Sequence, residues 1–219
     1  MSSEEALLSQ LLTGKLEKLH IEQHLKAQFS DAVIHGVASL LASKYHQQCL
    51  NLPSYIAYLQ QQTVVHQLQL RAIQEITKTL NRSGINFIVL KGWALAYSHY
   101  SKPYLRPKSD IDILINERDV SQTKAIFEKL GYINPRGWTP EYISFQFSRT
   151  KNLLHAVRNN VDIHLCLTND QRIQSYFPHS LMFQSATYCR QLGCDIVAPP
   201  QRYCMPASIY FITAAMAIL

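Results

Sequence analysis

The sequence predicts an α+β protein, in which a small mixed β-sheet with flanking helices follows a helical N-terminal region. Apolar residues recur at helical spacing through residues 1–83, whereas later segments show apolar runs or the period-two alternation of strands. Further helical segments separate these strands. Because the strands imply both an antiparallel hairpin and a parallel crossover, we expect a mixed sheet.

The N-terminal region is expected to consist of helices packed on one another. A first amphipathic helix is indicated by Leu7, Leu8, Leu11, Leu12, Leu16 and Leu19. A second is expected near residues 32–45. Pro53 and Ser54 form a start signal for a long helix that ends at Gly84.

A buried strand followed by a glycine is predicted next. Residues 85–90 form a continuous apolar run, and Gly92 opens a helix that carries Trp93, Tyr97 and Tyr100. A helix that starts after a strand and a glycine presents free N–H groups and a positive dipole end to an anion. Gly92 also leaves room for a phosphate, because it has no Cβ.

Residues 109–115 read S-D-I-D-I-L-I and are the most informative segment. In a strand, Asp110 and Asp112 share one face and the isoleucines share the other. Their Cα atoms would lie roughly 7 Å apart, close enough for both carboxylates to hold one divalent ion or an adjacent pair. The pair alone also fits a solvated strand edge.

A third carboxylate is expected to join them from residues 161–165, V-D-I-H-L, where alternation puts Asp162 and His164 on one face. The apolar run 153–157 and the Asn159–Asn160 pair suggest a hairpin that leads into this strand. Three carboxylates could therefore converge on one face of the sheet.

The remaining elements complete the predicted division of the chain. Asn116 and Asp119 could cap a helix that ends at Gly131, and residues 142–147 alternate like a strand. We expect a helical region 1–83, a catalytic domain 84–200, and in 201–219 the start of a helical C-terminal part that looks truncated. The apolar segment 207–219 is too short to span a bilayer.

Composition indicates a folded soluble protein. The chain has 219 residues, 47% of them hydrophobic, and a formal net charge of +6, which suits a polyanionic ligand such as a nucleotide. No Lys/Arg run or aromatic-basic signature indicates nucleic-acid binding. The five cysteines form no C-x-x-C pair, and the N-terminus lacks a basic signal-peptide region, so a cytoplasmic location is expected.

The series L-K-G-x-A-L, an arginine, D-I-D-I-L-I and V-D-I-H-L resembles the uncharacterised nucleotidyltransferase family of the DNA polymerase beta-like superfamily. The resemblance covers residues 85–165 closely. It implies the polymerase beta-like nucleotidyltransferase fold and a metal-dependent transferase. Such an enzyme moves a nucleoside monophosphate from an NTP, with ATP expected, to the hydroxyl of an unknown acceptor and releases pyrophosphate.

The resemblance also implies roles for particular residues. Asp110, Asp112 and Asp162 would be catalytic and would bind two Mg²⁺ ions, which Mn²⁺ could replace. Nucleotide binding would involve Lys91, Gly92, Trp93, Arg106 and Lys108. Arg106 is the preferred phosphate ligand, since a guanidinium binds phosphate through two parallel hydrogen bonds, whereas Lys91 and Lys108 could equally be solvated loop residues. His164 could orient an aspartate, although a structural role is favoured.

Two other functions remain open. The chain could be a catalytically inactive module that binds a nucleotide or a partner, because Trp93 follows Gly92 where most of the superfamily has serine or a second glycine. It could also be a toxin-like transferase that modifies protein or RNA. The oligomeric state is not predicted.

Overall fold

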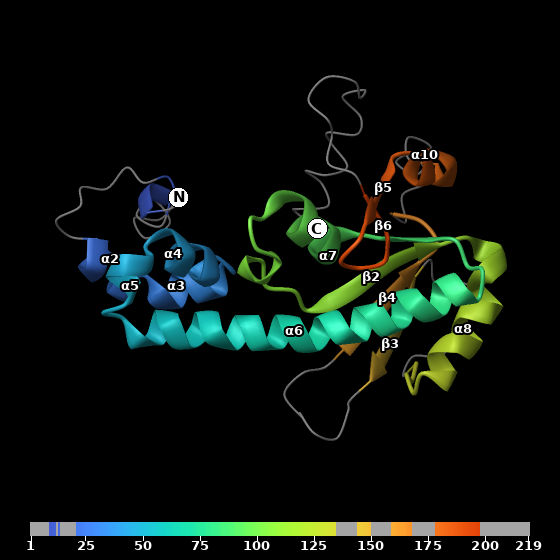
Figure 1. Ribbon diagram of the computed structural model, residues 1–219, viewed down its shortest axis with the longest axis horizontal. Coiled ribbons are helices and arrows are strands. Elements are labelled where there is room, and N and C mark those ends of the chain that lie inside the picture. Colours follow the sequence, from blue (N-terminus) through green and yellow to red (C-terminus); the bar gives the residue numbers. More distant parts are fainter. Residues whose placement is uncertain are drawn as a thin grey trace. The chain divides into compact units, whose positions relative to one another are not determined.

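The computed structural model describes residues 9–11, 13, 21–134, 144–149, 159–167 and 178–197 (Figure 1). Its contacts divide the chain into two compact units, one within residues 1–67 and 100–107 and the other within 68–99 and 108–219. The boundary at Leu68 falls inside the long helix α6 (Pro53–Arg82). The division into 1–83, 84–200 and 201–219 stays a prediction, and its last part lies outside the described residues.

The first unit is helical, which confirms the predicted N-terminal region. It is built from α2 (Ile21–Ala27), α3 (Phe29–Ile34), α4 (Ala38–Lys44), α5 (His46–Cys49), the first half of α6 and a 3-10 turn, η2 (Pro103–Leu105). Leu25, Leu41 and Tyr55 are fully buried in its core. The Tyr55 hydroxyl donates a hydrogen bond to the Leu25 carbonyl at 2.9 Å, so the buried phenol is paired.

The prediction of a single helix over residues 32–45 is wrong. The chain breaks between α3 and α4 at Gly36, which has a φ of +68° that ends a right-handed helix. The long helix was predicted correctly, and Gly84 with a φ of +69° follows it closely. Most of the leucine-rich segment at residues 7–19 lies outside the described residues.

The second unit contains a six-stranded mixed sheet, as predicted for the fold class. Its strands are β1 (Phe87–Val89), β2 (Asp110–Ile115), β3 (Ser144–Arg149), β4 (Asn159–His164), β5 (Ala186–Cys189) and β6 (Cys194–Val197). The strand order is β3-β4-β2-β1-β6-β5. Strand β1 is antiparallel to β2 and parallel to β6, and β2 is parallel to β4.

The two faces of this sheet are covered differently. The larger core contains Ile111 and Ile113 of β2 and residues from α6, α7 (Lys91–His99) and α8 (Val120–Lys129). The smaller core lies on the other face, where Leu114 packs with Met182 of α10 (His179–Gln184). Asp110 and Asp112 share the face of Leu114 by strand alternation, so the acidic residues lie opposite the larger core.

Three local predictions need correction. Asn116 and Asp119 make no side-chain cap, because a 3-10 turn, η3 (Glu117–Asp119), precedes α8. Asn159 and Asn160 are part of β4 and do not form a turn. Tyr100 follows the end of α7 at His99. Residues 153–157 lie outside the described residues, although β3 and β4 do pair antiparallel.

Candidate functional site

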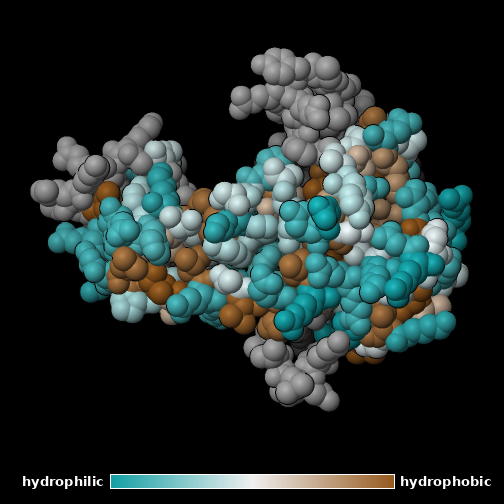
Figure 2. Space-filling model, viewed as in Figure 1, coloured by the Kyte–Doolittle hydropathy of each residue, from teal (hydrophilic) through white to brown (hydrophobic). Residues whose placement is uncertain are grey.

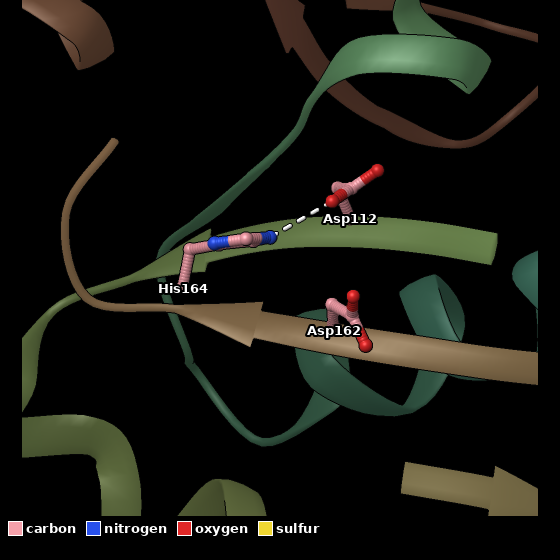
Figure 3. Close-up of side chains that lie close together, drawn as sticks. All are labelled: Asp112, Asp162 and His164. Atoms are coloured by element: carbon pink, nitrogen blue, oxygen red, sulfur yellow. Dashed lines mark hydrogen bonds and ion pairs between the residues drawn. The ribbon is translucent and has the colours of Figure 1, made fainter. Parts of the chain in front are cut away.

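The candidate site begins with two aspartates on adjacent strands. Asp112 of β2 and Asp162 of β4 are direct register partners in a parallel pair, so both side chains project from the same face of the sheet (Figure 3). His164 lies two residues after Asp162 and therefore shares this face. Ligand atoms of Asp112, Asp162 and His164 all lie within 4.8 Å of one another.

Asp112 is buried and carries two polar contacts on one oxygen. Its side chain is only 3% exposed, and Oδ1 lies 3.0 Å from Lys91 Nζ and 2.8 Å from His164 Nε2. Burial raises the pKa of Asp112, but the hydrogen bond with His164 and the charge of Lys91 outweigh it, so the pKa lies below its usual value. Asp112 is therefore held as a carboxylate.

Asp162 has the opposite electrostatic environment. Burial raises its pKa, and the charges of Asp112 and Asp110 raise it further, against smaller opposing effects of His164 and a hydrogen bond with Gln146. Its Oδ1 is buried and has no hydrogen-bond partner among the described residues. A buried acceptor without a partner is costly, so this oxygen is suited to a proton or a cation.

Asp110 lies at the edge of this group. It is half-buried at the start of β2, and its Oδ1 accepts a hydrogen bond from Ser109 Oγ at 3.1 Å. It does not belong to the close group of Asp112, Asp162 and His164, although its charge reaches Asp162. The structure thus places the predicted carboxylates on one face and brings two of them together.

The junction of β1 and α7 lies directly beside Asp112. The Leu90 N–H donates a hydrogen bond to the Asp112 carbonyl at 2.9 Å, and the next residue, Lys91, forms the ion pair described above. Lys91 has a φ of +47°, the only positive φ of a non-glycine residue in the described part of the chain. Such a backbone conformation is costly for a side chain with a Cβ and is often found at functional sites.

The first turn of α7 presents its free N–H groups at this junction. Lys91, Gly92 and Trp93 begin the nine-residue helix, and its positive dipole end favours a nearby anion. Gly92 does not have a positive φ, and a Cβ added there would lie 3.5 Å from Lys108 Cγ, an ordinary van der Waals distance. The fold therefore does not require glycine at this position.

The other predicted nucleotide ligands differ in placement. Trp93 is 1% exposed and lies in the larger core, with Lys108 Nζ 4.9 Å from the centre of its ring. The Lys108 carbonyl accepts a hydrogen bond from Gln69 Nε2 at 3.1 Å. Arg106 belongs to the first compact unit, where its guanidinium lies 5.9 Å from the Tyr100 ring. Their roles in nucleotide binding stay predictions.

The donor set fits a hard divalent cation. Mg²⁺ prefers oxygen ligands, which Asp112 and Asp162 supply, and the partnerless Oδ1 of Asp162 is an oxygen that a cation would satisfy. His164 adds a nitrogen that borderline metals accept more readily than Mg²⁺ does. The cluster therefore could hold a metal, while the identity and number of ions stay predictions.

Two features of the site were not predicted from the sequence. Lys91 was considered as a phosphate ligand or a solvated residue, but its side chain is 31% exposed and paired with Asp112. Gln146 was read only as part of a strand, yet its register partner is Asp162. The alternation of residues 142–147 could have placed Gln146 on the polar face; nothing in the sequence indicated the Lys91 ion pair.

The chain matches one known protein family. A family described as uncharacterised nucleotidyltransferase matches residues 26–203 of the chain. No curated protein and no solved structure matches. Within the described residues, no helix has both the length and the hydrophobicity to cross a bilayer. The matched segment covers most of the sequence, with parts of both compact units and the whole aspartate cluster, and the chain therefore belongs to the uncharacterised nucleotidyltransferase family.

Proposed function

We propose that this protein transfers a nucleoside monophosphate from an NTP, with ATP as the expected donor, to an acceptor hydroxyl. The acceptor oxygen forms a bond to the α-phosphorus, the bond from this phosphorus to the bridging oxygen breaks, and pyrophosphate leaves. The observation that carries the proposal is the pairing of Asp112 with Asp162 next to the start of α7.

The carboxylates are proposed to bind divalent metal and to prepare the acceptor. Asp110, Asp112 and Asp162 would hold two Mg²⁺ ions, or Mn²⁺ in their place. When bound, such ions stabilise charge on the attacking and leaving oxygens of an in-line displacement. Asp162 lies on the acceptor side in this proposal, and its partnerless Oδ1 can accept the proton of the acceptor hydroxyl.

The start of α7 is proposed to receive the triphosphate. Free N–H groups at Gly92 and Trp93 can donate hydrogen bonds to phosphate oxygens, and the helix dipole favours their negative charge. Lys91 can move from Asp112 to a phosphate oxygen, since its long side chain is partly exposed. Lys108 and Arg106 would add positive charge, and His164 would keep Asp112 oriented through their contact.

The test combines product release with identification of the acceptor. The protein is incubated with labelled ATP, Mg²⁺ and cell extract, then pyrophosphate is measured and labelled acceptors are identified by mass spectrometry. We expect Mg²⁺-dependent release that Asp110→Asn, Asp112→Asn and Asp162→Asn each nearly abolish. Asp119→Asn, which changes an aspartate outside the cluster, is the matched control and should retain activity.

The same experiment distinguishes the other functions. A labelled protein or RNA would identify a transferase that acts on macromolecules, whereas a labelled small molecule would identify a metabolic acceptor. ATP binding without pyrophosphate release in any extract would contradict the proposed transfer and would favour an inactive binding module.

A further inference from the structure

An open cavity lies in the same compact unit as the aspartate cluster but is formed by other elements. Its volume is about 330 Å³, and it lies between the end of α6 and the turn that joins β5 to β6. It is lined by Gln74, Thr77, Lys78, Asn81, Arg82, Arg190, Gln191, Leu192 and Gly193. This size is at the lower end of the range for small-molecule sites.

The wall of the cavity is fixed by three hydrogen bonds. Side chains of α6 donate to successive carbonyls of the turn: Gln74 to Gln191, Thr77 to Leu192 and Asn81 to Gly193, each at 2.8 Å. The turn also closes on itself, since the Gly193 N–H donates to the Cys189 carbonyl at 2.9 Å. Helix and turn therefore form a pre-organised surface.

The charged residues of this cavity all have the same sign. Lys78, Arg82 and Arg190 are exposed, and none of them makes a salt bridge or hydrogen bond with another described residue. No acidic residue lines the cavity. Glu75, one turn before Lys78, is held by Arg149 at 2.6 Å.

Three positive charges gather at this pocket, and no acidic residue lines it, so its surface attracts anions. Lys78 and Arg82 are four residues apart on one face of α6, where like charges repel, and Arg190 brings a third positive charge from the turn. Hydrophilic residues gather over the last turns of α6 (Figure 2). An anion bound in this pocket is within the lining that these three cations share, and each of them can form a charge-assisted hydrogen bond with it.

We propose that this cavity, defined by Lys78, Arg82 and Arg190, is a binding site for a small polyanion that carries phosphate groups. It is separate from the nucleotide site proposed above. Ile73, Ile76 and Leu80 of α6 pack in the larger core, on the sheet face opposite Asp112 and Asp162. The proposal therefore does not depend on the transferase activity. Such a site would suit a phosphorylated effector.

The test measures binding of inorganic pyrophosphate by calorimetry at low ionic strength, in EDTA so that no divalent metal assists the aspartate cluster. We expect binding to one site that weakens as salt is added. Arg82→Gln/Arg190→Gln should weaken it about tenfold or more, because two charge-assisted contacts are lost. Arg71→Gln/Arg118→Gln removes the same charge from exposed positions outside the cavity and should leave affinity unchanged.

Further variants separate this site from the proposed nucleotide site and from damage to the fold. Lys108→Gln removes a cation of the proposed triphosphate site and should retain pyrophosphate binding. Should Arg82→Gln/Arg190→Gln not fold, Lys78→Gln takes its place and should weaken binding. The proposal is overturned if the wild type does not bind, if both double variants weaken binding equally, or if Lys108→Gln alone removes it. Equal weakening would mean that only the general positive charge attracts pyrophosphate.

Discussion

Asp112 and Asp162 are register partners on the parallel strands β2 and β4, yet the protein shifts their pKa values in opposite directions. Both carboxyls are desolvated, which raises the pKa of each. Asp112 has Lys91 and His164 as partners, whereas the neighbours that dominate at Asp162 are Asp112 and Asp110. In the metal-free cluster, the charged form of Asp112 is therefore stabilised and the charged form of Asp162 is destabilised.

Because the charge on Asp162 is unfavourable in the folded protein, we expect its removal to stabilise the metal-free protein. Because folding raises the pKa of Asp162, the wild type loses stability as pH rises through the unfolded-state pKa toward the folded one. We expect Asp162→Asn to raise Tm by about 2–4 °C at neutral pH in EDTA, the effect of roughly 1 kcal/mol in a chain of this size. Melting curves at several pH values measure this difference.

The pH dependence provides the control. The advantage of Asp162→Asn should disappear below the carboxyl range, where both folded and unfolded wild type bind the proton. An advantage that is equal at all pH values would contradict the electrostatic explanation. Addition of Mg²⁺ should stabilise the wild type more than the variant, if the cluster binds the ion.

Asp112 should behave in the opposite way. Asp112→Asn weakens two contacts of a buried carboxylate, so we expect the free energy of unfolding to fall by about 1–3 kcal/mol at neutral pH without metal. Asp110→Asn is the comparison, with an expected loss below about 0.5 kcal/mol, because Asp110 is less buried. Urea denaturation measures both; equal losses would show that Asp112 has no special stabilising role.

The sequence predicted the sheet face of this cluster because strand alternation is a local property. D-I-D-I-L-I and V-D-I-H-L each separate polar from apolar residues, and the family resemblance, which the family match confirms, joined them in one site. The exact partnering of Asp112 with Asp162 depends on the register of two strands far apart in sequence. Register is set by tertiary packing and could not be read from either segment.

Other features were hidden for similar physical reasons. Lys91 has its positive φ where β1 leads into α7, and lysine gives no sequence signal for a positive φ. The break at Gly36 was missed because apolar periodicity continues across it. The cavity between α6 and the β5–β6 turn joins residues more than 100 positions apart, as the bond from Gln74 to Gln191 shows.

The backbone of Lys91 gives a matched pair of variants. Lys91→Ala and Lys91→Gly both remove the ammonium beside Asp112, but only glycine adopts a φ of +47° without strain. We expect the glycine variant to be more stable than the alanine variant by about 1 kcal/mol. Urea denaturation at neutral pH measures the difference, and a more stable alanine variant would contradict the positive φ at this position.

Gly92 separates the requirements of the fold from those of nucleotide binding. A Cβ at this position meets only Lys108, at 3.5 Å or more, so Gly92→Ala should change Tm by less than about 2 °C. Under the proposed function it should nevertheless weaken binding of a non-hydrolysable ATP analogue about tenfold, because a methyl group would stand where phosphate approaches. Unchanged affinity would remove Gly92 from the proposed phosphate site.

Replacing Arg149 is expected to destabilise the fold without any change in the aspartate cluster. Its buried guanidinium donates to the Leu130 carbonyl at 2.7 Å and to Glu75 Oε2 at 2.6 Å. Arg149→Met leaves the Leu130 carbonyl without this donor, so we expect the free energy of unfolding to fall by about 2–3 kcal/mol. Glu75→Gln keeps the Leu130 contact and changes a partly exposed residue, so its cost should stay below about 1 kcal/mol. Chemical denaturation of both variants tests this ranking, and the reverse order would mean that the ion pair, not the carbonyl contact, stabilises this edge of the sheet.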